Sequence, residues 1–365
     1  MSLTLAERPT TDIVATTRAF VRSELPSLID AIDKGQLYPA DFMRGLGACG
    51  AFQSHADTKS CDLNISIDAM SEVAELCGAS GFMTWCQAAL VWYIANSEND
   101  ALKSKLLAKV ASAQILGGTG LSNPMKSFYG IEKLKLKGKR VEGGYIINGG
   151  LPWVSNLGPD HLFATICELN TGERVMFVGD CADPALTLMD CDPFLAMDGT
   201  GTYGLMFKDV FIPDDMVLAH DAMSFVKKIR AGFVLLQSGM AVGIIRDCIE
   251  IMQKTKTQLG HVNKFLLAQQ PEDYSAILDE LDAEVRTLAA TPYDESDRYW
   301  QRVVACRLEA GDATMAAAHA AMLHTGARGY MMTNRAQRRM REAYFVGIVT
   351  PATKQLRKML AEMPA

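Results

Sequence analysis

The sequence lacks the residue patterns that hold metal ions or build disulfide frameworks. Its nine cysteines include no Cys-x-x-Cys pair, and its six histidines are dispersed along the chain. An odd number of scattered cysteines is typical of buried thiols in a reducing compartment. We therefore expect no metal site and a cytoplasmic protein.

Extended charge of one sign and long apolar runs are also missing. The formal net charge is −6, without a basic tail or stripe of the kind that binds nucleic acid. No uncharged apolar run reaches about 18 residues, the length that spans a bilayer. The N-terminus has no apolar core of the signal type. We expect no nucleic-acid partner, no membrane span and no internal repeat.

Helical periodicity dominates the first part of the chain. Ile65, Ala69 and Val73 recur at helical spacing, and residues 81–96 are nearly all apolar. A helix that is apolar all round is expected to be buried on most sides. These patterns predict an all-helical domain over residues 1–115.

Short runs separated by glycines follow, over residues 116–220. Leu134 and Leu136 alternate with lysines, which is the period of a half-exposed strand. Seven or eight strands of an antiparallel sheet are predicted, with runs at 133–141, 162–169, 174–179, 186–189 and 201–211. Asn148-Gly149-Gly150 favours a hairpin turn between two short strands, because Asn and Gly tolerate positive φ.

Helical periodicity returns over residues 221–365. Residues 223–258 are predicted to form one long helix, in which Gly232, Gly239 and Gly243 let a neighbouring backbone approach closely. Further helices are predicted at 272–290, 295–326, 333–344 and 351–362. The fold class is therefore α+β, with an N-terminal all-α domain, a middle antiparallel β-domain and a C-terminal domain like a four-helix bundle.

The most informative segment is 144–156, GYIINGGLPWVSN. Trp153 and Ser155 place an aromatic ring and a hydroxyl close together at a strand end. Such a pair suits a flat ligand rich in heteroatoms, since the ring packs against a face and the hydroxyl meets an edge. The alternative is that Trp153 simply packs in the core of a hairpin.

This segment resembles the middle domain of the acyl-CoA dehydrogenase superfamily, where a string such as YIINGxKxWITN recurs. Residues 195–213, LAMDGTGTYGLMFKDVFIP, resemble a second string of that superfamily. The resemblance implies the acyl-CoA dehydrogenase fold, with FAD, or less favourably FMN, held between the β-domain and the bundle. Trp153 would flank the flavin and Ser155 would bond its N5 edge. Backbone NH groups of Leu121, Ser122 and Asn123 would bond the flavin edge.

Other strings of the superfamily are altered here. The RxxFG string that clamps the dinucleotide corresponds to residues 256–260, so that Lys256 and Gln258 would meet the FAD phosphates across a subunit contact. Lysine keeps the charge but loses the bidentate fork of arginine. Gly326 and Gly329 keep the shape of a GGxGY turn. The resemblance also implies a homo-oligomer, a dimer or homotetramer, in which a neighbouring subunit completes the FAD site.

The usual catalytic glutamate of the superfamily is missing. Counting on from residues 341–343, which are similar to an RDA string, its position falls at Thr350. A threonine does not accept a proton at physiological pH, whereas a tuned carboxylate does. A second known position for the base falls within residues 230–236, which contain no carboxylate. Glu342 is the nearest carboxylate, and we expect it to pair with a neighbouring arginine, although it stays an outside candidate.

The resemblance implies a flavin-dependent oxidoreductase that oxidises a small molecule, such as a CoA thioester, by hydride transfer to FAD. Two alternatives stay open. One is a two-component flavin monooxygenase, which receives reduced flavin from a flavin reductase. In such an enzyme the flavin is the reagent, so no catalytic base is needed to remove a proton from the substrate. The other is a non-catalytic subunit paired with a catalytic dehydrogenase subunit. A helical scaffold without a ligand is a third, less favoured interpretation.

Overall fold

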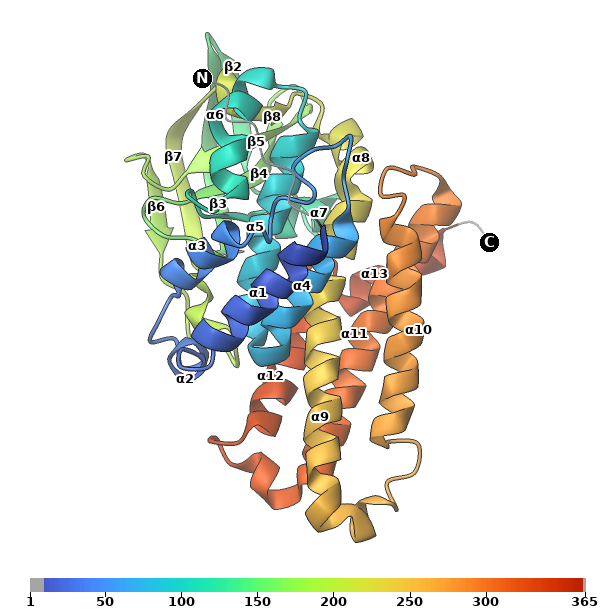
Figure 1. Cartoon of the computed structure of the whole chain (residues 1–365). Coiled ribbons are helices and arrows are strands. Elements are labelled where there is room, and N and C mark those ends of the chain that lie inside the picture. Colours follow the sequence, from blue (N-terminus) through green and yellow to red (C-terminus); the bar gives the residue numbers. More distant parts are fainter. Residues whose placement is uncertain (1–9, 364–365) are drawn as a thin grey trace.

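The computed structural model describes residues 10–363 (Figure 1). The first nine residues, on which much of the expectation about a signal segment rests, lie outside this range. The N-terminal segment is helical, as predicted. Its helices are α1 (Thr10–Glu24), α2 (Ile29–Asp33), α3 (Ala40–Ala48), α4 (Leu63–Leu76), α5 (Gly78–Asn96) and α6 (Asp100–Ala111).

Polar caps and burial account for these helices. Asp62 accepts a hydrogen bond from the backbone NH of Asn64 at the start of α4, and Asn99 accepts one from Leu102 at the start of α6. Such caps satisfy NH groups that have no partner within the helix. Every residue of α5 is buried, as its apolar composition predicts.

The middle segment forms one eight-stranded sheet in the order β6-β7-β3-β2-β4-β5-β8, with β1 also paired to β4. Its strands are β1 (Gly117–Thr119), β2 (Lys137–Val141), β3 (Gly144–Val154), β4 (Leu162–Leu169), β5 (Arg174–Asp180), β6 (Leu186–Met189), β7 (Tyr203–Pro213) and β8 (Val217–Ala219). The sheet is mixed and not purely antiparallel, because β1 and β2 both run parallel to β4. Alternation of side chains does not encode strand direction. The connection from β1 to β2, which contains helix α7 (Ser122–Phe128), sets that direction here.

The predicted hairpin turn at Asn148-Gly149-Gly150 is wrong, because β3 continues through it. The register between β3 and β7 shifts between Ile147 and Gly149, where Gly149 has a φ of 125°. Asn148 donates to Asp209 Oδ1 and accepts from the backbone NH of Asp209. The positive φ therefore serves an irregularity in a long strand, and the hairpin lies one strand earlier, between β2 and β3.

The C-terminal segment is again helical, as predicted. Its helices are α8 (Ala222–Leu235), α9 (Ser238–Asn263), α10 (Pro271–Ala289), α11 (Asp297–Thr325), α12 (Arg335–Ile348) and α13 (Thr353–Glu362). The single long helix predicted at 223–258 is two helices in the structure, with Leu236 and Gln237 between them. By length and composition alone, Ala222–Asn263 could cross a membrane, but 89% of its most apolar window is buried inside the protein.

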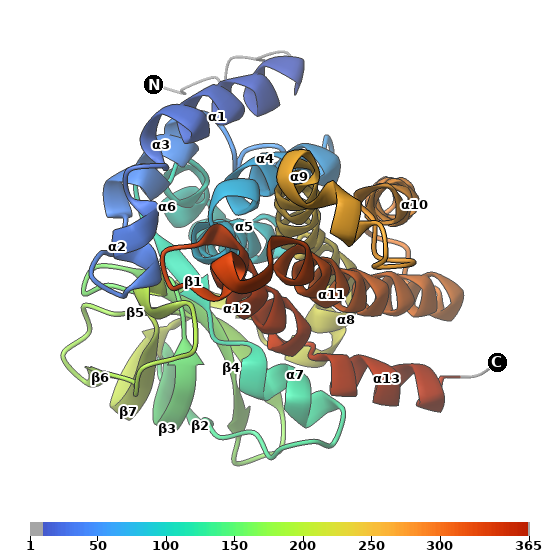
Figure 2. The same ribbon diagram turned by 90° about the horizontal axis from the view of Figure 1, so that it is seen from below.

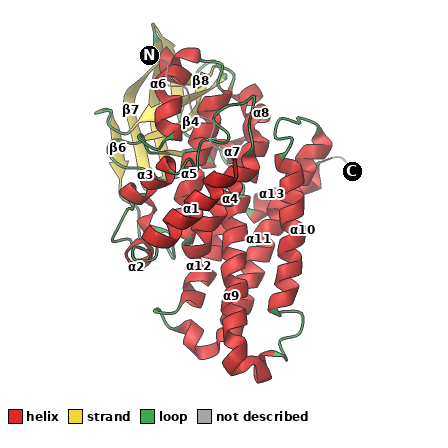
Figure 3. Cartoon of the chain, viewed as in Figure 1, coloured by secondary structure: helices red, strands yellow, loops and turns green. Residues whose placement is uncertain are grey.

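The sheet lies at one end of the molecule and the long helices extend from the other (Figures 1 and 3). Seen from below, α5 and α12 lie between the sheet and helices α9–α11 (Figure 2). A single hydrophobic core runs through all three segments. The place where these segments meet therefore has apolar walls supplied by each of them.

Candidate active site

A cavity of about 410 Å³ lies where the sheet, α5, α7 and α12 meet. Ligand pockets typically measure about 300–1,000 Å³, so this cavity is large enough for a small molecule. One wall comes from the sheet segment, including Trp153 and Ser155. The opposite wall comes from α12 and the residues that follow it, ending at Thr350.

Trp153 is presented to the cavity by an irregularity in the sheet. Its φ is 56°, and the register of β3 against β7 shifts between Leu151 and Val154. A bulge can re-aim a side chain, and a non-glycine residue in the left-handed region is a feature of functional sites. The side chain is 57% exposed, which rules out the alternative of a core tryptophan. Its ring is free to cover the face of a flat ligand.

Ser155 is almost buried, and its hydroxyl lies at the cavity wall. Its Oγ is 2.6 Å from Thr202 Oγ1, which is in turn 2.8 Å from Thr200 Oγ1. Ser155 and Thr202 both line the cavity. The sequence reasoning found Ser155 but missed Thr202, although Thr202 lies within the second recognised string.

The segment predicted to bond the flavin edge, residues 121–123, is not a plain loop, because helix α7 begins at Ser122. Leu121 and Ser122 line the cavity. The side chain of Asn123 is used elsewhere: it donates to Glu132 and to Lys133 O, and it accepts from the backbone NH of Lys135. Asn123 therefore fixes the segment after α7, and its predicted part in ligand binding remains a prediction about its backbone.

Thr350 lies directly after α12 and faces the cavity beside Ser122. The two hydroxyl oxygens are 2.9 Å apart, and the carbonyl of Thr350 accepts a hydrogen bond from Gln237 Nε2 at 2.9 Å. Gln237 itself is held by Arg307, whose Nε donates to Gln237 Oε1 at 2.7 Å. Because Thr350 is anchored through Gln237 between α8 and α9, its position in the cavity is well defined.

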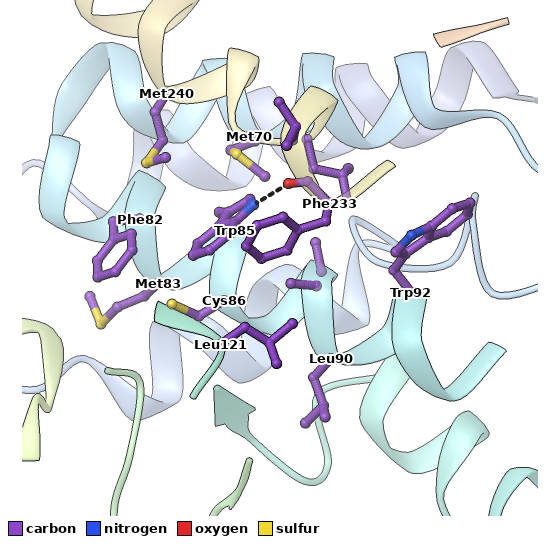
Figure 4. Close-up of a cluster of buried hydrophobic side chains, with 14 of the residues drawn as sticks. Met70, Phe82, Met83, Trp85, Cys86, Leu90, Trp92, Leu121, Phe233 and Met240 are labelled. Carbon is purple, nitrogen blue, oxygen red and sulfur yellow. Dashed lines mark hydrogen bonds between the residues drawn. The ribbon is translucent and has the colours of Figure 1, made fainter. Parts of the chain in front are cut away.

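Aromatic side chains complete the walls. Trp85 donates from Nε1 to Phe233 O at 3.2 Å, as Figure 4 shows. Phe82 packs edge-on against Phe345 with ring centroids 4.5 Å apart. These four rings come from α5, α8 and α12, and all four line the cavity. The walls are therefore mostly apolar, with polar and charged side chains at a few points.

Residues 9–114 match the family model described as acyl-CoA dehydrogenase, N-terminal domain. The chain is 25% identical over 192 residues to the mitochondrial isovaleryl-CoA dehydrogenase of Oryza sativa subsp. japonica, covering 50% of this chain and 46% of that protein. That match thus spans about half the length of the relative. The mitochondrial short-chain specific acyl-CoA dehydrogenase of Homo sapiens is 23% identical over 369 residues, covering 96% of this chain and 88% of that one. The structure of butyryl-CoA dehydrogenase from Megasphaera elsdenii matches with a TM-score of 0.87 at 16% identity, covering 99% of both chains.

Residues 9–114 therefore match the N-terminal domain of the acyl-CoA dehydrogenases, and the chain as a whole has the acyl-CoA dehydrogenase fold. The resemblance seen in the two strings of the β-domain is confirmed, and so is the fold class. Trp153 and Ser155 are far from Thr350 in the sequence, and the fold brings all three to one cavity.

The cavity is poor in groups that accept protons. Among residues 10–363, the charged side chains that line it are Lys126 and Arg341, and none is a carboxylate or an imidazole. Lys126 pairs with Glu132 at 3.0 Å, and Arg341 pairs with Asp33 at 2.5 Å. The resemblance also gives an alternative position for the base within residues 230–236. Phe233 of this segment lines the cavity, but the segment contains no carboxylate.

Glu342 does not line the cavity, and its predicted ion pair is confirmed. Its carboxylate accepts from Arg339 Nη1 at 2.6 Å, from Arg338 Nη1 at 3.2 Å and from the backbone NH of Gly78 at 3.0 Å. Arg339 also reaches the carbonyl of Ala74 at the end of α4. The pair thus bridges two helix ends, with the arginine at carbonyl groups and the carboxylate at an NH group. A carboxylate held in this way has a structural role.

The other four predicted cofactor-binding residues, Lys256, Gln258, Gly326 and Gly329, do not line this cavity. Lys256 pairs with Glu272, and Gln258 Oε1 lies 3.4 Å from Arg328 Nη1. Gly326 and Gly329 belong to η3 (Gly326–Tyr330), the turn after α11. From Ser238 to Lys256 helix α9 rises by roughly 27 Å. Within one chain these residues do not join Trp153 and Ser155, so their predicted role requires a second copy.

Proposed function

We propose that this chain is an FAD-dependent oxidoreductase that oxidises a small acyl-linked substrate, such as a CoA thioester. The observation that carries the proposal is the cavity between the sheet and α12, with Trp153 and Ser155 on one wall and Thr350 on the other. The relatives named above are dehydrogenases of acyl-CoA compounds, which supports this reaction class.

The residues present fit a flavin. An exposed indole, the hydroxyls of Ser155 and Thr202, and an apolar segment at Leu121 match a ring system that has one polar edge. A bound flavin supplies a two-electron acceptor, which the side chains themselves do not provide. Trp153 would cover one face of the ring, and the Leu121–Ser122 backbone would meet its edge.

Ser122 and Thr350 would bind the polar part of the substrate. Two hydroxyls that share one hydrogen bond retain one hydrogen, which is free to turn toward a ligand. Such a pair orients a carbonyl oxygen but does not remove a proton from carbon. The proton therefore has to leave to a group that does not line the cavity of this chain.

We also propose a cytoplasmic homo-oligomer, a dimer or tetramer, in which Lys256 and Gln258 of one copy bind the FAD phosphates of another. The position of these residues at the far end of α9 supports this arrangement. Gly326 and Gly329 would shape the turn beside them.

The first test is the absorbance spectrum of protein mixed with FAD and desalted, followed by anaerobic addition of CoA thioesters. Retained flavin bands that a thioester bleaches are expected. Thr350→Glu would add a carboxylate to the cavity lining. The rate at which a thioester bleaches the flavin should then rise by roughly 10²-fold, the lower end of the range for a general base. Thr350→Gln has the same size without a proton acceptor and is the matched control. Equal rates in the two variants would contradict the proposed place of the base.

A second candidate is a two-component flavin monooxygenase, and the lack of a carboxylate or imidazole on the cavity walls among residues 10–363 favours it. It predicts that thioesters leave the flavin unbleached, while reduced flavin supplied by a reductase reacts with oxygen at the protein. A chain that retains no FAD in either test would instead be the non-catalytic subunit of a paired dehydrogenase.

A further inference from the structure

Three hydroxyl groups form a chain that starts at the cavity and ends inside the protein. It begins at Ser155, passes to Thr202 and then to Thr200, whose Oγ1 donates to Met197 O at 2.6 Å. Ser155 and Thr202 line the cavity, whereas Thr200 is fully buried and does not. The inner residue therefore influences the cavity through its hydrogen bonds to Thr202 and to Met197, which also lines the cavity.

The direction of these hydrogen bonds follows from the inner end. A carbonyl oxygen only accepts, so Thr200 gives its single hydroxyl hydrogen to Met197 O. Thr200 then accepts from Thr202, and Thr202 accepts from Ser155. Because Ser155 has given away its only hydrogen, its oxygen faces the cavity as a hydrogen-bond acceptor.

We propose that this hydroxyl chain makes the site bind reduced flavin more tightly than oxidised flavin, an inference that rests on the function proposed above. N5 of reduced flavin carries a hydrogen and pairs with an acceptor. N5 of oxidised flavin is itself an acceptor and needs a donor. Ser155 supplies the acceptor as the chain stands, and it becomes a donor only if the chain reverses.

If the donor–acceptor direction of the hydroxyl chain reverses, one buried hydrogen bond is lost. If Ser155 donates to a ligand, Thr202 turns its hydrogen to Ser155. Thr200 then either leaves Met197 O, which keeps only the backbone NH of Thr200 at 3.1 Å, or faces Thr202 with oxygen against oxygen at 2.8 Å. Buried polar groups that lose a partner in a region of low dielectric are costly, so the penalty falls on the oxidised form alone.

The test is the midpoint potential of the FAD-loaded protein, measured anaerobically by absorbance against a reference dye, because it reports the ratio of the two dissociation constants. Thr200→Val removes the inner end of the chain at a residue that does not itself line the cavity. We expect it to lower the preference for reduced FAD by at least about tenfold, which equals a fall of about 30 mV for a two-electron couple. Thr200→Ser keeps the hydroxyl and should keep the wild-type potential.

Lys126 and Arg341 also line the cavity and favour an anionic ligand, so the decisive quantity is the difference between variants. Thr314→Val is the matched control, since Thr314 is an equally buried threonine that donates to a backbone carbonyl, on α11. Its potential should equal that of the wild type. If Thr200→Val does not fold, Thr202→Val breaks the same chain and should lower the potential as well.

The failures are distinguishable. A wild-type protein that binds FAD, with folded Thr200→Val or Thr202→Val showing the wild-type potential, contradicts the hydroxyl chain alone. A wild-type protein that binds FAD in neither oxidation state contradicts the proposed function and this inference together.

Discussion

His55 shows how burial alone changes the chemistry of one residue. Its ring is fully buried, with Nδ1 2.7 Å from Ser66 Oγ and Nε2 2.9 Å from Ala88 O. Burial lowers the pKa of His55 to about 4, since the charged form would lose its hydration. The ring therefore stays neutral in the folded protein at pH 7 and has a structural role.

This shift predicts how stability depends on pH. Between pH 6.5 and about 4 the unfolded chain binds a proton at His55 and the folded chain does not, so the free energy of unfolding falls as the pH falls through this window. The contribution lost is at most about 3 kcal/mol, at 1.36 kcal/mol per pH unit. Urea unfolding at pH 7 and at pH 4.5 measures it. His55→Gln keeps a donor and an acceptor but does not titrate, and it should lose this part of the pH dependence. An unchanged slope in the variant would assign the loss to other groups.

At the scale of elements, helix α9 depends on glycines where it crosses α4. A Cβ at Gly243 would lie 2.5 Å from Ser71 O and 2.6 Å from the backbone nitrogen of Glu75, both on α4. A Cβ at Gly239 would lie 2.8 Å from Ile67 O. The close approach expected from the small residues of this segment is therefore confirmed, and α4 is the neighbour.

Gly243→Ala should destabilise the protein by about 1–3 kcal/mol, because two helix backbones must move apart. The midpoint of thermal or urea unfolding measures this effect. Gly260→Ala on the same helix is the matched control, since the only neighbour of its added Cβ is Lys256 Cβ at 3.9 Å. That change should be neutral or stabilise by about 0.4–1 kcal/mol. Equal effects at the two positions would show that α9 and α4 can separate freely.

At the scale of the whole molecule, the far end of the bundle exposes an apolar surface. Its most exposed side chains are Phe265, Leu267, Tyr330 and Met332, which are 73–81% exposed. Exposed apolar patches of this kind mark interaction sites. They lie close in the sequence to Lys256, Gln258, Gly326 and Gly329, so a contact between copies here would bring these predicted cofactor-binding residues to a partner.

Phe265→Asp should therefore lower the oligomer mass and the retained FAD together, each at least several-fold, because a charge at an apolar contact opposes association. Sedimentation velocity and the flavin absorbance of desalted protein measure the two quantities. Phe211→Asp is the control, since Phe211 is 44% exposed on β7, in the sheet. Loss of FAD from a variant of unchanged mass would separate the phosphate contact from assembly.

The sequence by itself determined the order of helices, sheet and helices, because hydrophobic periodicity and glycine spacing are local properties. It also located Trp153 and Ser155 through one recognisable string, and Thr350 through a count of residues from 341–343. The lack of a carboxylate at Thr350 is likewise a property of the chain that no folding changes.

Tertiary structure decided the features that depend on contacts between residues distant in the sequence. It turned the expected hairpin at Asn148 into an irregularity of one long strand, because Asp209 on β7 pairs with that residue. It divided the long C-terminal helix at Gln237, whose side chain bonds Thr350 and Arg307. It also joined Ser155 to Thr202 and Thr200, since β3 and β7 become neighbours only in the sheet. Local patterns specify elements, whereas the contacts that give a cavity its hydrogen-bonding character form between elements.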